Sequence, residues 1–201
     1  MKFPLFASFI VLIIWLKYEI GKADRKKTKA SESFWDKESR ANNVRKQPLD
    51  SLHYIEIPLD LIPRDLLTEY EAVRNALSII DSLQGKKIVN LNGITNTDLK
   101  LTYGTANITP LSEYDENYTS LITAIYTIAS LLYEKGYTEQ AIPLLEFGVM
   151  TKTDMSGYYR ILYQYYSDKD KSRLAWLQNR AENVDGLMKE SILKIVHPDS
   201  P

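Results

Sequence analysis

The stretch that decides the fold is residues 118–183, which read YTSLITAIYTIASLLYEKGYTEQAIPLLEFGVMTKTDMSGYYRILYQYYSDKDKSRLAWLQNRAEN. A pattern recurs within it at a spacing of 34 residues: Ile125 and Tyr159, Ile128 and Leu162, Ala141 and Ala175. A period of this length is typical of helical hairpins that stack on one another as repeats. The stretch therefore predicts an all-α fold.

Apolar residues spaced three or four positions apart predict a series of helices along this stretch and beyond it. The predicted ranges are 118–133, 138–149, 156–166, 172–183 and 184–196. Gly136 is a natural helix stop, and Thr138 is a candidate cap for the helix that follows. The last range is expected to close the open end of the stack, since stacked repeats need a terminal cap. The apolar residues that it supplies are Leu187, Met188, Ile192, Leu193 and Val196.

The two hairpins resemble the tetratricopeptide repeat, a family of 34-residue helix–turn–helix units. In the first unit the matching residues are Ile125, Ile128, Ala129, Leu132, Gly136, Ala141 and Leu145; in the second they are Tyr159, Leu162, Tyr166 and Ala175. Tyr163 and Asn179 depart from the pattern, so the helices of the second unit must lie further apart or rotate. The resemblance covers roughly a third of the chain. It implies that a partner binds on a concave surface, and it implies no chemistry.

An apolar run, Phe3 to Leu16, lies at the start of the chain. Extended as a helix to Ile20, it reaches about 27 Å, close to the roughly 30 Å of bilayer hydrocarbon. Trp15 and Tyr18 suit the aromatic belt at a membrane surface. We expect a single-pass transmembrane helix over residues 1–20. Its anchor residues are Phe3, Ile10, Ile14, Trp15 and Tyr18.

A cleaved signal peptide is the alternative, and it would give a secreted or cell-surface protein. The leader has only Lys2, however, and the cleavage signal is poor because Gly21 and Ala23 flank a lysine. The range 17–46 carries ten basic and five acidic residues. The positive-inside rule then places the N-terminus outside the cell membrane and the C-terminal domain in the cytoplasm.

We expect four parts along the chain. They are an anchor (1–20), a basic linker with a short helix from Ser33 (21–46), an N-terminal helix with an irregular region (47–117), and the hairpins with a capping helix (118–201). In the third part, Leu52–Leu59 reads as an extended segment, because Pro58 cannot lie in a central strand. Pro63–Leu83 reads as a helix that stops at Gly85.

The range 86–117 is rich in Asn, Asp and Gly, which favour turns. It predicts either an ordered loop or an irregular pair of short helices. Two roles are open for it: a structural plug between helical units, or a polar recognition loop. The candidate partner-binding residues are Asn92, Asn96, Asp98, Tyr103 and Asn107 in this range, with Tyr159 and Arg160 in the predicted helix 156–166.

Composition argues against several chemistries. The chain has no cysteine, which removes disulfides and thiol catalysis, and His53 and His197 do not make a typical zinc site. Phosphate-binding-loop, zinc-protease and nucleophile-elbow motifs are missing. Residues 47–201 carry fourteen basic and twenty-one acidic residues, an unfavourable balance for nucleic acid. We therefore expect no enzyme activity, cofactor, metal or nucleic-acid partner.

The sequence as a whole predicts a membrane-tethered helical-repeat protein that acts as a protein–protein interaction module, with a protein or peptide as its partner. A structural subunit of a larger membrane complex is the alternative, and a hydrolase with an unrecognised site is a third reading. The arrangement is also similar to small membrane-tethered helical proteins of Gram-positive bacteria.

Overall fold

The structure is a computed structural model that describes residues 3–198; for residues 3–11, 14, 21 and 23–31 it describes the helical backbone without the side chains. All regular secondary structure in this range is helical, which confirms the all-α prediction. The chain divides into two compact units. One comprises Met1–Gln47 and Asn96–Ala106, and the other comprises Pro48–Thr95 and Asn107–Pro201.

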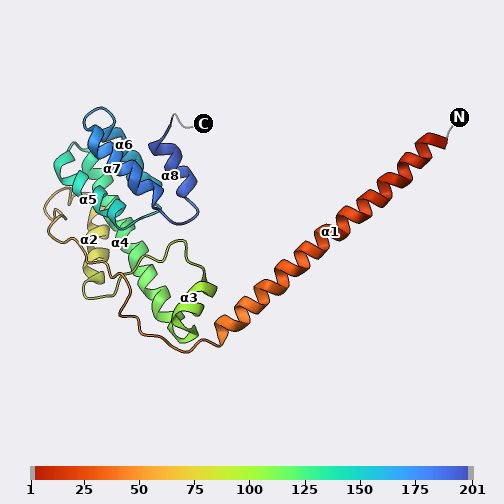
Figure 1. Ribbon diagram of the computed structural model, residues 1–201. Helices are drawn as coiled ribbons and strands as arrows, with labels where there is room; N and C mark the ends of the chain where they lie inside the picture. Colours follow the sequence, from red (N-terminus) through yellow and green to blue (C-terminus); the bar gives the residue numbers. More distant parts are fainter. Residues whose placement is uncertain (1–2, 199–201) are drawn as a thin grey trace. The chain divides into compact units, whose positions relative to one another are not determined.

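The first unit contains α1 (Phe3–Asn42) and α3 (Asn96–Tyr103). Helix α1 is a single helix of 40 residues, and Figure 1 shows it without a break. It continues through residues 21–32, where we expected a linker, and Ser33 lies inside it instead of capping a new helix. Lys, Arg, Glu and Ala dominate that stretch, and these residues favour a helix as readily as they favour solvated coil.

The anchor residues all lie in α1. The side chains of Phe3, Ile10 and Ile14 fall outside the part of the chain that the structure describes, whereas Trp15 and Tyr18 are exposed. In the described part, no helix combines the length and the apolar character that crossing a membrane requires.

Helices α1 and α3 are joined by a small polar network. The Glu38 carboxylate accepts a hydrogen bond from the Thr97 hydroxyl at 2.7 Å and pairs with the Lys100 ammonium. The Lys37 ammonium lies 2.7 Å from the Asp98 carboxylate. Together with the burial of Ala41 in α1 and Leu99 in α3, these contacts fix the register of α3 against α1.

Acidification is expected to loosen α3 from α1. Hydrogen bonds from Lys100 and Thr97 hold the pKa of the Glu38 carboxyl below its ordinary value of 4.5. A folded-state pKa that is lowered contributes stability above about pH 4.5, and this contribution is lost as the pH falls toward the folded pKa. Hydrogen-exchange protection factors of the α3 amides should fall between pH 6 and pH 3.5 in the native chain and change less in Glu38→Gln. Equal pH sensitivity in both chains would contradict this assignment.

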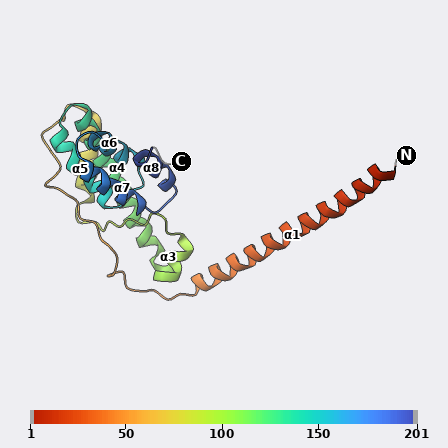
Figure 2. The ribbon, with the colours of Figure 1, turned by 45° about the horizontal axis from the view of Figure 1, so that its top comes forward.

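The second unit contains α2 (Glu71–Leu83), α4 (Ile108–Glu134), α5 (Thr138–Met150), α6 (Ser156–Tyr166), α7 (Lys171–Glu182) and α8 (Lys189–Val196), and η1 (Thr105–Asn107) leads into α4. Helix α4 packs against both α2 and α5, while α6 packs against α5, α7 and α8. Figure 2 shows α5 to α8 gathered beside α4. The shared apolar core therefore runs along the hairpins α4–α5 and α6–α7, and the predicted extended segment 52–59 lies against it through the partly buried Ile55 and Ile57.

Several helix limits differ from the predicted ones. Helix α4 begins ten residues early, at Ile108, because Pro110 is compatible with a first helical turn and Leu111 is buried against the core. Helix α2 begins at Glu71, well after Pro63. Leu67 precedes it with a left-handed backbone (φ 56°), which a continuous helix cannot contain. Helix α8 begins only at Lys189.

The residues before α8 correct one expectation about the capping helix. Leu187, predicted to close the stack, is 97% exposed, and Met188 is also exposed. Gly186 (φ 119°) turns the chain just before them, so the apolar face of the cap is limited to α8 itself. Ile192 and Val196 are buried there as predicted.

Tyrosines supply much of the seam between the hairpins. Tyr158 is fully buried, and its hydroxyl donates a 2.6 Å hydrogen bond to the carbonyl of Ile122 in α4. Its ring lies directly over Gly148 in α5, where an added Cβ would come within 2.2 Å of the ring. The missing side chain at Gly148 is therefore what lets α5 and α6 approach each other.

Burial follows the 34-residue spacing in the first helix of each hairpin but not in the second. Tyr159, Leu162 and Tyr166 are buried in α6, as are Ile125, Ile128 and Leu132 in α4. In α7, however, Ala175 is exposed although Ala141 is fully buried. Helix α7 instead buries Leu177 and Ala181, which follow Leu144 and Gly148 by 33 residues. One residue corresponds to about 100° of helix rotation, so α7 is turned relative to a strict repeat.

Candidate functional site

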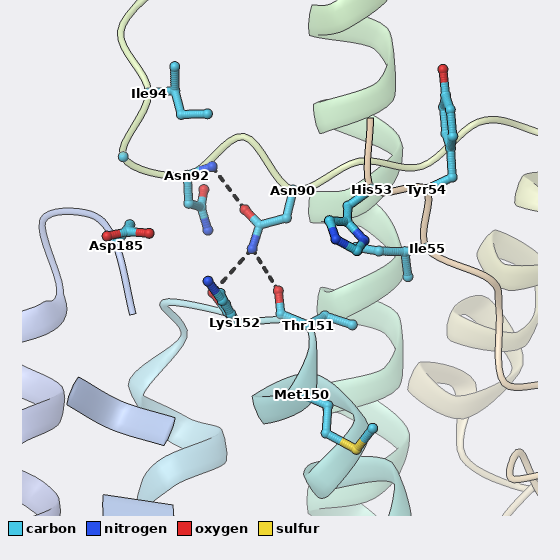
Figure 3. A pocket seen from close by; sticks show the side chains of 11 residues that line it. His53, Tyr54, Ile55, Asn90, Asn92, Ile94, Met150, Thr151, Lys152 and Asp185 are labelled. Atoms are coloured by element: carbon cyan, nitrogen blue, oxygen red, sulfur yellow. Dashed lines mark hydrogen bonds between the residues drawn. The ribbon is translucent and has the colours of Figure 1, made fainter. Parts of the chain in front are cut away.

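A pocket of about 460 Å³ lies within the second unit, where three irregular segments meet (Figure 3). The extended segment 53–55, the turn 90–94 and the turn at the end of α5 form its walls, and Asp185 completes its rim. The lining residues are His53, Tyr54, Ile55, Asn90, Asn92, Gly93, Ile94, Met150, Thr151, Lys152 and Asp185.

Asn90 holds two of these walls together. Its Nδ2 donates to the carbonyls of Thr151 at 2.8 Å and Lys152 at 3.1 Å, and it lies 3.2 Å from the Tyr118 hydroxyl. Its Oδ1 accepts from the backbone N–H of Asn92 at 2.8 Å. Carbonyls at a helix C-terminus lack partners within the helix, and Asn90 satisfies this need at the end of α5. The Asn90 amide therefore has a structural role, because its hydrogen bonds hold the turn 90–94 against the end of α5.

Lys152 has an unusual backbone for its residue type. Its φ is 59°, in the left-handed region, at the position after a helix end where glycine is the common choice. Its N–H donates to the carbonyl of Val149 at 3.1 Å, and the N–H of Thr153 donates to the carbonyl of Gly148 at 3.2 Å. A left-handed conformation costs an ordinary L-residue about 1–2 kcal/mol, so Lys152 is held in place by its surroundings.

Two carboxylates fix the turn 90–94 by accepting hydrogen bonds from it. The Oδ1 of Asp115 accepts from the N–H of Leu91 at 2.9 Å, and the Oδ1 of Asp154 accepts from Nδ2 of Asn92 at 3.0 Å. Burial raises the pKa of Tyr118 to about 12, so its hydroxyl remains a neutral hydrogen-bonding group beside Asn90. Hydrogen bonds from residues outside the pocket therefore hold the turn 90–94, which forms one of its walls.

The predicted partner-binding residues are divided between the two units. Asn92 is half-buried at the pocket, whereas Asn96, Asp98 and Tyr103 belong to α3 in the first unit. Asn107 and Tyr159 are fully buried, and the Tyr159 hydroxyl donates to the carbonyl of Thr153 at 3.0 Å. Arg160 is exposed on α6. The range 86–117 thus comprises a turn, α3, η1 and the start of α4.

A second feature is a cluster of aromatic rings and cations on α6, α7 and the turn between them, here called the aromatic–cation surface. It consists of Tyr165, Lys169, Arg173, Trp176 and Arg180. The Arg173 and Arg180 guanidinium carbons lie 5.1 Å and 6.0 Å from the centre of the Trp176 ring, and the Lys169 ammonium lies 4.3 Å from that of Tyr165. Such cation–π contacts hold the cations at the surface.

The Glu146 carboxylate anchors one end of this surface. It accepts hydrogen bonds from the Tyr166 hydroxyl and from the Arg173 guanidinium. Burial, with the nearby Glu146 carboxylate, raises the pKa of Tyr166 above its ordinary range. Arg173 is therefore neutralised in part, whereas Lys169 and Arg180 form no ion pair with the side chains that the structure describes.

The acidic residues near α7 have a structural explanation. The Asp170 carboxylate caps α7 by accepting from the N–H groups of Ser172 and Arg173. In the part of the chain that is described, no three metal-ligating side chains gather into a cluster. Comparison of the chain with protein-family models, with curated proteins and with solved structures found no match in any of the three.

Proposed function

We propose that this protein is a membrane-tethered helical module that binds a protein partner through the aromatic–cation surface. The observation that carries the proposal is a half-buried tryptophan, Trp176, lying between two arginines on one face of α7. Trp, Tyr and Arg are the residues that most often dominate the energy of protein interfaces. The hairpins α4–α5 and α6–α7, which resemble tetratricopeptide repeats in sequence, support a binding role over a chemical one.

The charge of this surface indicates the partner's chemistry. Lys169 and Arg180 carry positive charge that no described carboxylate pairs with, although residues 47–201 as a whole have an excess of acidic residues. Opposite charge across an interface steers association and fixes orientation. The partner is therefore expected to present an acidic segment with an apolar residue that contacts Trp176.

The tether is supported by the sequence. The apolar run Phe3–Leu16 and the basic residues that follow it fit a single-pass anchor, with the N-terminus outside and the C-terminal domain in the cytoplasm. From Ile20 to Asn42, α1 extends about a further 33 Å, which makes it long enough to act as a stalk above a membrane surface.

Affinity capture of the full chain from membranes of its source organism tests the partner role. A specific partner should be recovered with the native chain and lost by at least tenfold with Trp176→Ala and with the charge reversal Arg180→Glu. Leu187→Ala is the matched control, since Leu187 is 97% exposed and outside the aromatic–cation surface. Recovery that is equal for all four chains would contradict the proposal, provided that thermal unfolding shows Arg180→Glu to be folded.

A structural subunit of a larger membrane complex, held through the anchor itself, is the alternative. Exchanging residues 1–20 for an unrelated transmembrane helix distinguishes binding through the aromatic–cation surface from binding through the anchor. Partner recovery that survives the exchange supports the aromatic–cation surface as the contact, and recovery that is lost supports the anchor.

A further inference from the structure

We propose that the pocket in Figure 3 is a binding site for a small zwitterion, a free amino acid or a dipeptide, held at its two charged ends by Lys152 and Asp185. This site is separate from the partner-binding role, and either role can fail without the other.

Two side chains of opposite charge line the pocket, and they do not form an ion pair with each other. Lys152 and Asp185 are both exposed and both line the cavity. Among the described side chains, no carboxylate oxygen lies within 4.0 Å of the Lys152 ammonium, and no cationic nitrogen lies within 4.0 Å of the Asp185 carboxylate. The ammonium and the carboxylate therefore lie further apart than direct pairing allows. A ligand that carries a carboxylate and an ammonium complements both.

The backbone around these charges is built from left-handed turns. Gly93 (φ 82°), Lys152 (φ 59°) and Gly186 (φ 119°) all lie in or beside the pocket rim. A Cβ on Gly93 would come within 2.8 Å of the Asp185 Cβ, so glycine at this position lets the two turns touch. The Asp185 backbone and Cβ therefore lie next to the turn 90–94.

Lys152 occupies a left-handed backbone position that glycine would adopt with less strain. Strain of this kind persists at positions where the surrounding structure enforces it, and such positions cluster at ligand sites. The Asn90 amide enforces this left-handed conformation, because its Nδ2 donates a hydrogen bond to the Lys152 carbonyl at 3.1 Å. A lysine at this position places an ammonium group at the rim of the cavity, which a glycine cannot do.

The remaining walls suit an apolar side chain. Ile55, Ile94 and Met150 line the cavity together with Tyr54. A volume of about 460 Å³ falls within the range of roughly 300–1,000 Å³ that small-molecule sites occupy. The cavity therefore has room for an amino acid or dipeptide with a leucine-sized side chain.

Calorimetric titration of the purified full chain tests the proposal, with L-leucine, Leu-Leu, N-acetyl-Leu-Leu and Leu-Leu-amide as probes. At least one of the two zwitterions is expected to saturate the site. Removing either charged end is expected to weaken binding by at least about tenfold, because a hydrogen bond to a charged group is lost. Leucine binding alone assigns a free amino acid, and Leu-Leu binding alone assigns a dipeptide. No saturation by either zwitterion, or equal binding of the blocked peptides, overturns the proposal.

Variants locate the site. Lys152→Met and Asp185→Asn are each expected to weaken zwitterion binding at least about tenfold, whereas the matched controls Lys171→Met and Asp168→Asn leave it unchanged. Lys152→Gly is the sharpest variant, because it should raise the melting temperature while it weakens binding. Unchanged binding in Lys152→Gly would show that the ammonium is not a ligand group, and would overturn the assignment.

Discussion

Replacing Tyr158 with alanine is expected to lower the free energy of unfolding by about 3–5 kcal/mol, as for other large aromatic side chains in a core. Three contacts are lost at once. The ring packs on Gly148 in α5 and lies 5.2 Å from the Tyr126 ring in α4, and the hydroxyl donates to the Ile122 carbonyl. Because Tyr158 belongs to α6, one substitution removes several of the contacts that join the two hairpins, while those of Glu146 with Tyr166 and Arg173 remain.

Chemical denaturation of the full chain measures this effect. Tyr158→Phe is the matched control, because it keeps the ring and leaves only the Ile122 carbonyl without its 2.6 Å hydrogen bond. It should cost about 1–3 kcal/mol. A loss below 1 kcal/mol for Tyr158→Ala would mean that the hairpins do not share one core.

Deleting residues 3–20 is expected to move the protein from the membrane fraction to the soluble fraction. The apolar run is the segment that the tether proposal depends on, and the rest of α1 is strongly charged. A chain in which residues 3–20 are exchanged for an unrelated transmembrane helix should stay with the membrane. Carbonate extraction followed by centrifugation gives the distribution. Native protein released by carbonate, or a deleted chain that stays in the pellet, would contradict the anchor.

The helices of the hairpins could be predicted because their signal is local. Positions such as Ile125, Ile128 and Leu132 recur at helical spacing, and all three are buried. The limits of helices were harder to predict. The polar turns at the start of α4 resemble a loop in composition, and the left-handed Leu67 carries no sequence signal, since leucine rarely adopts that conformation.

The pocket could not be predicted from the sequence because its parts are distant along the chain. Asn90 and Thr151 are 61 residues apart, and nothing near Asn90 distinguishes it from the other asparagines of the range 86–117. Tyr159 was proposed as a partner-binding residue, but the structure places it in the core. Its type suits a contact surface, but its position repeats that of the buried Ile125, and this signal was enough to place it in the core.

The rotation of α7 also depends on tertiary packing. The 34-residue spacing aligns Ala175 with Ala141, yet only Ala141 is buried. The departures Tyr163 and Asn179 indicated that the second hairpin would separate or rotate, and a change in burial by one residue shows that α7 is rotated. Trp176 and its two arginines meet for a local reason, because Arg173 and Arg180 lie three residues before and four residues after Trp176 on α7.

Site-specific photocrosslinking in intact membranes tests the proposed tethered binding module most directly. A photoreactive residue at Trp176 should give one discrete adduct with another protein, which floats with the membrane fraction and disappears with Arg180→Glu. The same probe at Leu187, which is 97% exposed and lies outside the aromatic–cation surface, should give none. Identical adducts from both positions, or no adduct at Trp176, would contradict the proposal.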